Sequence, residues 1–188
     1  MPPTAHPHQG WPTGPGVPPS ARPAIPAGPF QVICYWLLWG MALGLPVIVI
    51  GIRSVTQTFG WFALAYLMFG IFGNVVVQGL LAAMASASAK AWTPRAIGTR
   101  AGVASLVYYA SWAGLALSLR DFGDSGPSAP SWVEEVIGRQ GADAMVWVFL
   151  VLGAVSLVAT FALIIIDGDA AARRAWGTPR PGGPGRKA

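Results

Sequence analysis

Long apolar runs alternate with short polar segments along the chain, and this pattern predicts its secondary structure. Each of the four longest runs is 19 to 25 residues long and contains no Asp, Glu, Lys or Arg. As helices with a rise of about 1.5 Å per residue they would be about 28–37 Å long, enough to cross a hydrocarbon core of about 30 Å. The predicted spans are residues 32–52, 61–85, 101–119 and 145–166.

A helix satisfies its own backbone hydrogen-bonding groups, which is a requirement for a chain that crosses lipid. The predicted fold class is therefore all-α, a polytopic membrane protein in which residues 31–176 form a four-transmembrane-helix bundle. Composition supports this class, because 10% of the residues are charged and 54% are hydrophobic. Soluble domains have about 25% charged residues, so this composition argues against a soluble domain.

The distribution of Lys and Arg predicts how the spans are oriented. Nine of the twelve basic residues fall in the two terminal segments or in the connection between the second and third spans, and only Arg53, Arg120 and Arg139 fall elsewhere. Cytoplasmic segments carry the excess of Lys and Arg, so we expect a multi-pass protein of the cell membrane with cytoplasmic N- and C-termini. This bias also explains the net charge of +5. No basic folded module is present, so nucleic acid is not an expected partner.

The two ends of the chain differ in composition from the spans. Residues 1–30 contain ten prolines and four glycines, and residues 177–188 combine Pro and Gly with basic residues. Such segments cannot bury a core, so both are predicted to be disordered cytoplasmic tails. Six N-terminal prolines fall in two groups with a spacing of three, which aligns them along one edge of a polyproline II helix. The N-terminal tail is therefore either a flexible spacer or a docking segment.

Residues 120–144 form the longest connection between spans and are predicted to lie outside the cell. Within them, Ser131 and Glu134 match a capping box, in which two side chains bond free amides at the start of a helix. Apolar and charged residues separate to opposite faces over 132–139, which predicts a short amphipathic helix on the membrane surface. The alternative is a cation or partner site made by the five acidic residues of this loop, although their spacing matches no calcium loop.

The connection between the second and third spans contains a helix-start signal. Thr93 is suited to cap a helix, and Pro94 is suited to its first turn, where the missing amide would be unpaired in any case. The third helix is therefore expected to begin near Pro94, before the chain enters the membrane.

Polar side chains interrupt three of the four spans at similar depths. Asn74 and Gln78 lie one turn apart near the centre of the second span, and the third and fourth spans carry hydroxyl groups at the same levels. An amide that faces lipid loses its hydrogen bonds to water, so these groups are expected to bond between helices. The predicted interhelical polar layer comprises Asn74, Gln78, Ser105, Tyr109, Ser156 and Thr160. The small residues expected to allow close helix packing are Gly40, Gly44, Gly70, Gly73, Ala110 and Gly114.

The alternative role for this polar layer is to line a permeation path. The four predicted spans contain no Asp, Glu, Lys, Arg or His, whereas proton-coupled carriers and pumps usually place an ionisable group there. Bonding between helices is therefore the favoured interpretation. A path for an uncharged solute, or for an ion in an oligomer, is the alternative.

The chain lacks the residue sets of a catalytic or metal site. Both histidines, His6 and His8, lie in the predicted N-terminal tail, where two ligands on a mobile segment make a weak metal site. Cys34 is the only cysteine and has no base nearby in the sequence. No catalytic residue, metal ligand or cofactor is predicted, and we expect that the protein is not an enzyme.

In its overall layout the chain resembles the uncharacterised small four-helix integral membrane proteins with Pro/Gly-rich tails that are common in high-GC Gram-positive bacteria. The resemblance covers the succession of spans and tails, and it implies no particular activity. The sequence therefore predicts a non-enzymatic structural or accessory subunit. Its expected partners are the lipid bilayer and a membrane protein or a second copy of the chain. A small channel or transporter component with a neutral polar path is the alternative function.

Overall fold

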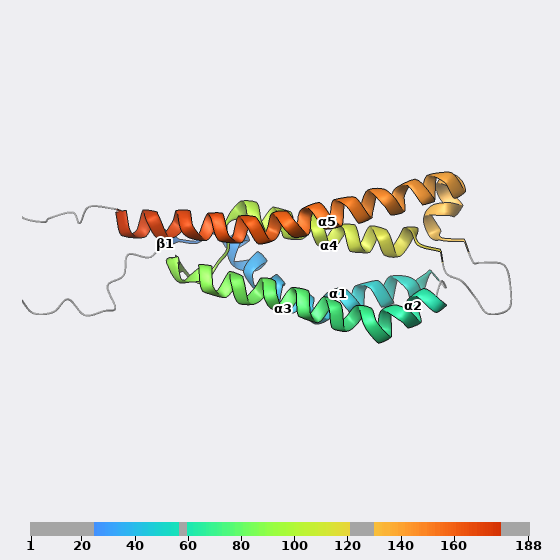
Figure 1. Ribbon diagram of the computed structural model, residues 1–188, viewed down its shortest axis with the longest axis horizontal. Coiled ribbons are helices and arrows are strands. Elements are labelled where there is room, and N and C mark those ends of the chain that lie inside the picture. The colour runs from blue at the N-terminus through green and yellow to red at the C-terminus, as the bar shows by residue number, and fades with distance from the viewer. Residues whose placement is uncertain (1–24, 57–59, 121–129, 178–188) are drawn as a thin grey trace, which may run out of the picture.

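The structure is a computed structural model that describes residues 25–56, 60–120 and 130–177. The predictions that concern residues 1–24, 121–129 and 178–188, which include most of both tails, lie outside these described residues. Five helices run along the long axis of the molecule (Figure 1). The five helices are α1 (Pro29–Val55), α2 (Trp61–Ala65), α3 (Ile71–Ser88), α4 (Thr99–Ser118) and α5 (Trp132–Gly177).

The helices form two layers, which Figure 1 shows in side view. Helix α5 packs along α4 in one layer, and α1 and α3 make up the other; α1 also contacts α4, and α3 contacts α5. We call the end of the bundle where α1 and α4 begin the basic end, because Lys90, Arg95 and Arg100 lie there. The opposite end, where α1 ends and α5 begins, is called the loop end.

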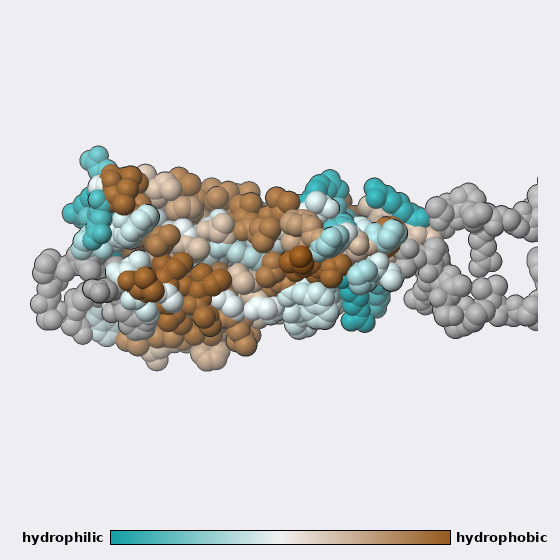
Figure 2. All heavy atoms as spheres, turned by 180° about the vertical axis from the view of Figure 1, so that it is seen from behind, coloured by the Kyte–Doolittle hydropathy of each residue, from teal (hydrophilic) through white to brown (hydrophobic). Residues whose placement is uncertain are grey.

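Four helical segments are long and apolar enough to cross a membrane, in agreement with the four predicted spans. On the face shown in Figure 2, hydrophobic residues form a broad band with hydrophilic residues toward both ends. Large side chains such as Leu43, Phe72 and Val158 point outward from the helices with about 70% of their surface exposed. A bundle surrounded by lipid requires apolar side chains on its outer surface, as found here. The fold is all-α and contains four candidate membrane-spanning helices. These segments are Pro29–Val55, Trp61–Ala91, Thr99–Ser118 and Trp132–Ala175.

The core lies between the two layers. Tyr35 and Leu38 of α1 are almost completely buried, as is Leu81 of α3. These side chains belong to one cluster with Ala101 and Tyr108 of α4, so three helices share a single core. The buried residues of α1 recur at helical spacing, which turns one face of this helix toward the core.

Helix α1 begins earlier than the predicted span. Pro29 occupies its first turn, and the side-chain oxygen of Gln31 accepts a hydrogen bond from the amide of Gly28 at 2.8 Å. Both features favour a helix start at this point. Just before it, β1 (Ile25–Pro26) pairs in parallel with β2 (Trp92–Thr93), so residues 25–30 are part of the fold rather than of a disordered tail.

The second predicted span contains a change of helix geometry. A π-helical turn, η1 (Tyr66–Gly70), separates α2 from α3, and a short 3-10 turn, η2 (Ala89–Ala91), ends α3. A Cβ atom on Gly70 would lie 2.3 Å from the ring of Tyr66. The missing side chain of Gly70 therefore leaves room for the Tyr66 ring beside this turn. Single π-helical turns of this kind occur mostly within α-helices.

The prediction that Thr93 and Pro94 start the third helix is wrong. Thr93 lies in strand β2, where its carbonyl oxygen accepts a hydrogen bond from the amide of Ala27. Helix α4 starts at Thr99 after Gly98. The pairing with β1 holds Thr93 in an extended conformation, and this tertiary contact overrides the local capping signal.

The fourth predicted span and the predicted surface helix belong to one element, α5. Gly138 has φ 77° and ψ 171°, and its non-helical conformation makes a kink between the two parts. The amide of Glu134 donates to the hydroxyl of Ser131 at 3.2 Å, as the capping box predicts, whereas the Glu134 carboxylate pairs with Arg120 instead of completing the box. At its other end α5 continues about three turns beyond residue 166.

Candidate functional site

The predicted polar layer begins at Asn74 in α3. Its side-chain amide nitrogen donates to the backbone carbonyls of Ala42 at 3.0 Å and Met41 at 3.4 Å in α1. Its oxygen, Oδ1, is buried and has no hydrogen-bond partner among the described residues. Asn74 thus links α3 to the backbone of α1 and presents an unused acceptor.

Gln78 takes part in the only hydrogen bond that joins two of the six predicted layer residues from different helices within the described part of the chain. The hydroxyl of Tyr109 in α4 donates to Gln78 Oε1 at 3.2 Å, and Gln78 is completely buried. Gln78 Nε2 has no partner among the described residues. Tyr109 is therefore joined to Gln78, whereas Asn74 is joined to the backbone of α1.

The three aliphatic hydroxyl groups of the predicted layer bond within their own helices. Ser105 donates to Gly102 O at 2.8 Å, Ser156 to Leu152 O at 2.6 Å, and Thr160 to Ser156 O at 2.7 Å. A serine or threonine in a helix can always reach the carbonyl three or four residues earlier, so these groups are satisfied without a neighbouring helix. The structure therefore brings Gln78 and Tyr109 together, connects Asn74 to α1, and leaves the other three outside the interhelical bonding.

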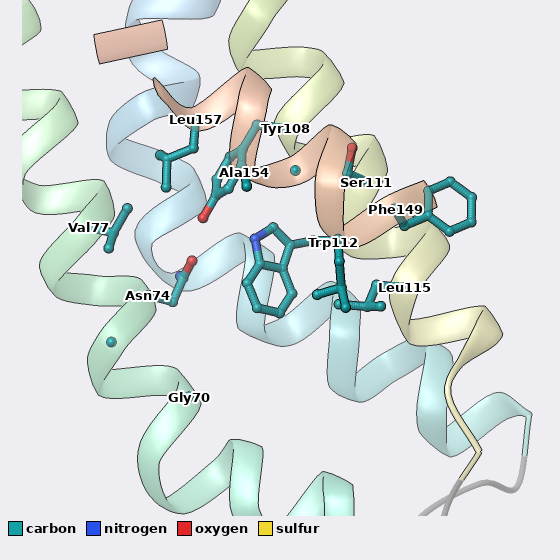
Figure 3. A pocket seen from close by; sticks show the side chains of 13 residues that line it. Gly70, Asn74, Val77, Tyr108, Ser111, Trp112, Leu115, Phe149, Ala154 and Leu157 are labelled. Atoms are coloured by element: carbon teal, nitrogen blue, oxygen red, sulfur yellow. The ribbon is translucent and has the colours of Figure 1, made fainter. Parts of the chain in front are cut away.

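A cavity of about 420 Å³ lies beside Asn74, between α3, α4 and α5. Its walls are mostly apolar, and its polar groups are few. Figure 3 shows the hydroxyl of Tyr108, the indole of Trp112 and the amide of Asn74 converging on the same space. The lining residues are Gly70, Gly73, Asn74, Val77, Tyr108, Ser111, Trp112, Leu115, Phe149, Leu150, Gly153, Ala154 and Leu157.

The small residues predicted to allow close packing behave differently from one another. A Cβ on Gly114 would lie 2.4 Å from the ring of Phe149 in α5, so Gly114 does mark a close contact. Gly70 accommodates Tyr66 of its own segment, and Gly44 faces Met41 of its own helix. Contrary to the prediction, Gly40, Gly73 and Ala110 are exposed, and a Cβ on Gly40 or Gly73 would meet no atom within 4 Å.

Two close contacts were missed because nothing in the local sequence marks them. A Cβ on Gly168 of α5 would lie 2.7 Å from Cβ of Ser88, the last residue of α3. A Cβ on Gly102 of α4 would lie 3.0 Å from the sulfur of Cys34 in α1. Cys34 is buried, and it packs there as a small apolar side chain.

Charged residues at both ends of the bundle also join helices. At the basic end, Arg100 of α4 pairs with Asp167 of α5 at 2.7 Å, and the Asp167 carboxylate lies against Gly98. At the loop end, Arg53 is buried in α1 and donates to the carbonyl oxygens of Ala116 and Leu119 at the end of α4.

A sequence signal for these contacts exists. Arg53 directly follows the apolar run 32–52, Arg100 directly precedes the run 101–119, and Asp167 directly follows the run 145–166. Once the spans alternate in direction, Arg100 and Asp167 must lie at the same end of the bundle. Their opposite charges could therefore have been paired from the sequence.

These features define a class of protein: an all-α chain with four candidate membrane-spanning helices and an apolar cavity between three of them. No protein-family model, curated protein or solved structure matches the chain. Its function is therefore inferred from its own residues and contacts.

Proposed function

We propose that the chain is a non-enzymatic structural or accessory subunit of the cell membrane, crossing it four times with both termini in the cytoplasm. The excess of Lys and Arg at the basic end supports this orientation. Broad exposed apolar faces support contact with lipid and with a membrane protein or a second copy of the chain.

The hydrogen bonding at the centre of the bundle carries this proposal. Asn74 bonds the α1 backbone, Tyr109 bonds Gln78, and the aliphatic hydroxyl groups of the layer bond their own helices. Arg53 and Asp167, the buried charged residues among those described, lie at opposite ends of the bundle, away from this layer. Polar groups that hold helices together in this way set the register of a bundle and do not require transport or catalysis.

Substituted-cysteine labelling tests the proposed orientation. In a Cys34→Ala background, the exposed positions Lys90 and Glu135 mark the basic end and the loop end, respectively. We expect a membrane-impermeant maleimide to label Glu135→Cys in intact cells and to label Lys90→Cys only after the membrane is permeabilised. Labelling in the reverse order would show that the basic end faces outward.

Replacement of the paired amide tests whether the polar layer stabilises the bundle. We expect Gln78→Leu to lower the free energy of unfolding by about 1 kcal/mol, because the buried Tyr109 hydroxyl loses its partner. Unfolding in mixed micelles of increasing SDS content measures the change. Ser156→Ala is the matched control, since its hydroxyl bonds only its own helix, and a loss as large as that of Gln78→Leu would contradict the proposed role of the layer.

A small channel or transporter component is the second candidate function, and the cavity beside Asn74 is the observation that favours it. Flux separates the two functions. For an accessory subunit, we expect liposomes containing the purified protein to take up glycerol and potassium no faster than protein-free liposomes. Reproducible flux that Asn74→Leu abolishes in a folded protein would favour transport and refute the accessory role.

A further inference from the structure

We propose that the cavity between α3, α4 and α5 is a binding site for an uncharged apolar alcohol, whose hydroxyl group donates to Oδ1 of Asn74. This ligand site is additional to the proposed accessory role and does not depend on it. The volume of about 420 Å³ falls within the range of about 300–1,000 Å³ that is typical of small-molecule sites.

The orientation of the Asn74 amide places an acceptor at the cavity. Its nitrogen is committed to the carbonyls of Ala42 and Met41, and an amide turned the other way would set its oxygen against those carbonyl oxygens. Oδ1 is therefore held on the opposite side, where Figure 3 shows it facing Tyr108 and Trp112. Asn74 is 7% exposed, and this oxygen has no partner among the described residues.

The ligand must supply a donor to this oxygen. A buried acceptor without a partner is costly, and a ligand that brings a donor removes the cost. A hydroxyl fits best, because it can donate to Asn74 while it accepts from the hydroxyl of Tyr108 or the indole N–H of Trp112. An ammonium group is disfavoured, because none of the cavity residues carries a negative charge.

The rest of the ligand must be apolar. Leu115, Phe149 and Leu157 contribute large apolar side chains to the walls, and no charged residue lines the cavity. Gly73, Leu150 and Ala154 line the cavity and are also exposed on the outer surface of the bundle. The site therefore borders the bilayer, and a ligand dissolved in lipid can enter sideways between α3 and α5.

Photolabelling of the full-length protein in phosphatidylcholine nanodiscs tests the site. The probe is a farnesol derivative with a diazirine in its chain, and the matched probe is its methyl ether, which can accept but cannot donate a hydrogen bond. We expect half-maximal labelling by the alcohol at about tenfold lower concentration, with mass spectrometry locating the label on residues of the cavity wall. Equal labelling by both probes would mean that water satisfies Asn74, and label spread over the outer faces would mean ordinary partition into lipid; either result overturns the proposal.

Two variants of α5 test whether the cavity itself holds the probe. Ala154→Phe places a large side chain on the cavity wall, on a different helix from Asn74, and we expect labelling to fall at least fivefold. Val158→Phe is the matched control, since Val158 is 68% exposed and does not line the cavity. Circular dichroism and gel filtration verify that both variants are folded. Unchanged labelling of folded Ala154→Phe, or an equal fall in both variants, would refute the site.

Discussion

Replacing Arg53 with leucine is expected to lower the free energy of unfolding by about 3 kcal/mol. Arg53 is 1% exposed, and Nη1 donates to the carbonyl oxygens of Ala116, in the last turn of α4, and of Leu119, directly after the helix. The final carbonyls of a helix have no partners within it and carry its negative pole, so a buried cation is well placed there. The guanidinium also lies 5.2 Å from the ring centre of Phe62, within reach of a cation–π contact.

SDS-induced unfolding measures this loss, and two further variants define its cause. Arg139→Leu removes an exposed arginine at the same end of the bundle and is expected to change stability by less than about 0.5 kcal/mol. Arg53→Lys keeps the charge but loses the planar donor group, so its stability should lie between those of wild type and Arg53→Leu. Equal stability of Arg53→Leu and Arg139→Leu would show that the contact with α4 contributes nothing.

Replacing Gly168 with leucine should separate α5 from α3 at the basic end and lower the free energy of unfolding by about 3 kcal/mol or more, because the added side chain would overlap Ser88. Even alanine should cost about 1–3 kcal/mol, because its Cβ would lie 2.7 Å from Cβ of Ser88, and neither atom can move without its backbone. Gly73→Ala is the matched control on α3. Its Cβ meets no atom within 4 Å, so the better helix propensity of alanine should leave stability unchanged or raise it by up to about 1 kcal/mol.

A double variant identifies the clash as the cause. Ser88→Gly removes the atoms that Gly168→Ala would strike, so the combined variant should be more stable than the sum of the two single losses implies. Additive losses in SDS-induced unfolding would contradict close packing at this point, because residues that touch are expected to be coupled.

The spans could be predicted from the sequence because crossing a membrane depends on length and hydropathy, which are properties of a continuous segment. All four predicted runs lie in helices that are long and apolar enough to cross a membrane, to within one residue at their ends. The helix-start signal at Thr93 failed for the opposite reason. Thr93 pairs with a segment more than sixty residues away, and no local pattern reports such a contact.

The residues of the polar layer could be predicted from the sequence, whereas their hydrogen-bond partners could not. Depth along a span follows from counting residues, and it correctly grouped Asn74, Gln78 and Tyr109 in the buried part of the bundle. The hydrogen-bond partners depend on how each helix is rotated about its axis and on side-chain length, which counting residues along a span does not give. Asn74 reached the α1 backbone, and Tyr109 reached Gln78.

The sequence by itself determined that the chain is all-α, that four of its segments can cross a membrane, and which of the segments outside the spans carry most of the Lys and Arg, because these features follow from hydropathy and charge counted along the chain. Only the tertiary structure decided that Gly168 touches Ser88 and that Arg53 closes the end of α4. The cavity beside Oδ1 of Asn74 likewise exists only because three helices pack around it. These features depend on which faces of different helices pack against one another. That packing joins segments that lie far apart in the sequence, so no local pattern reports it.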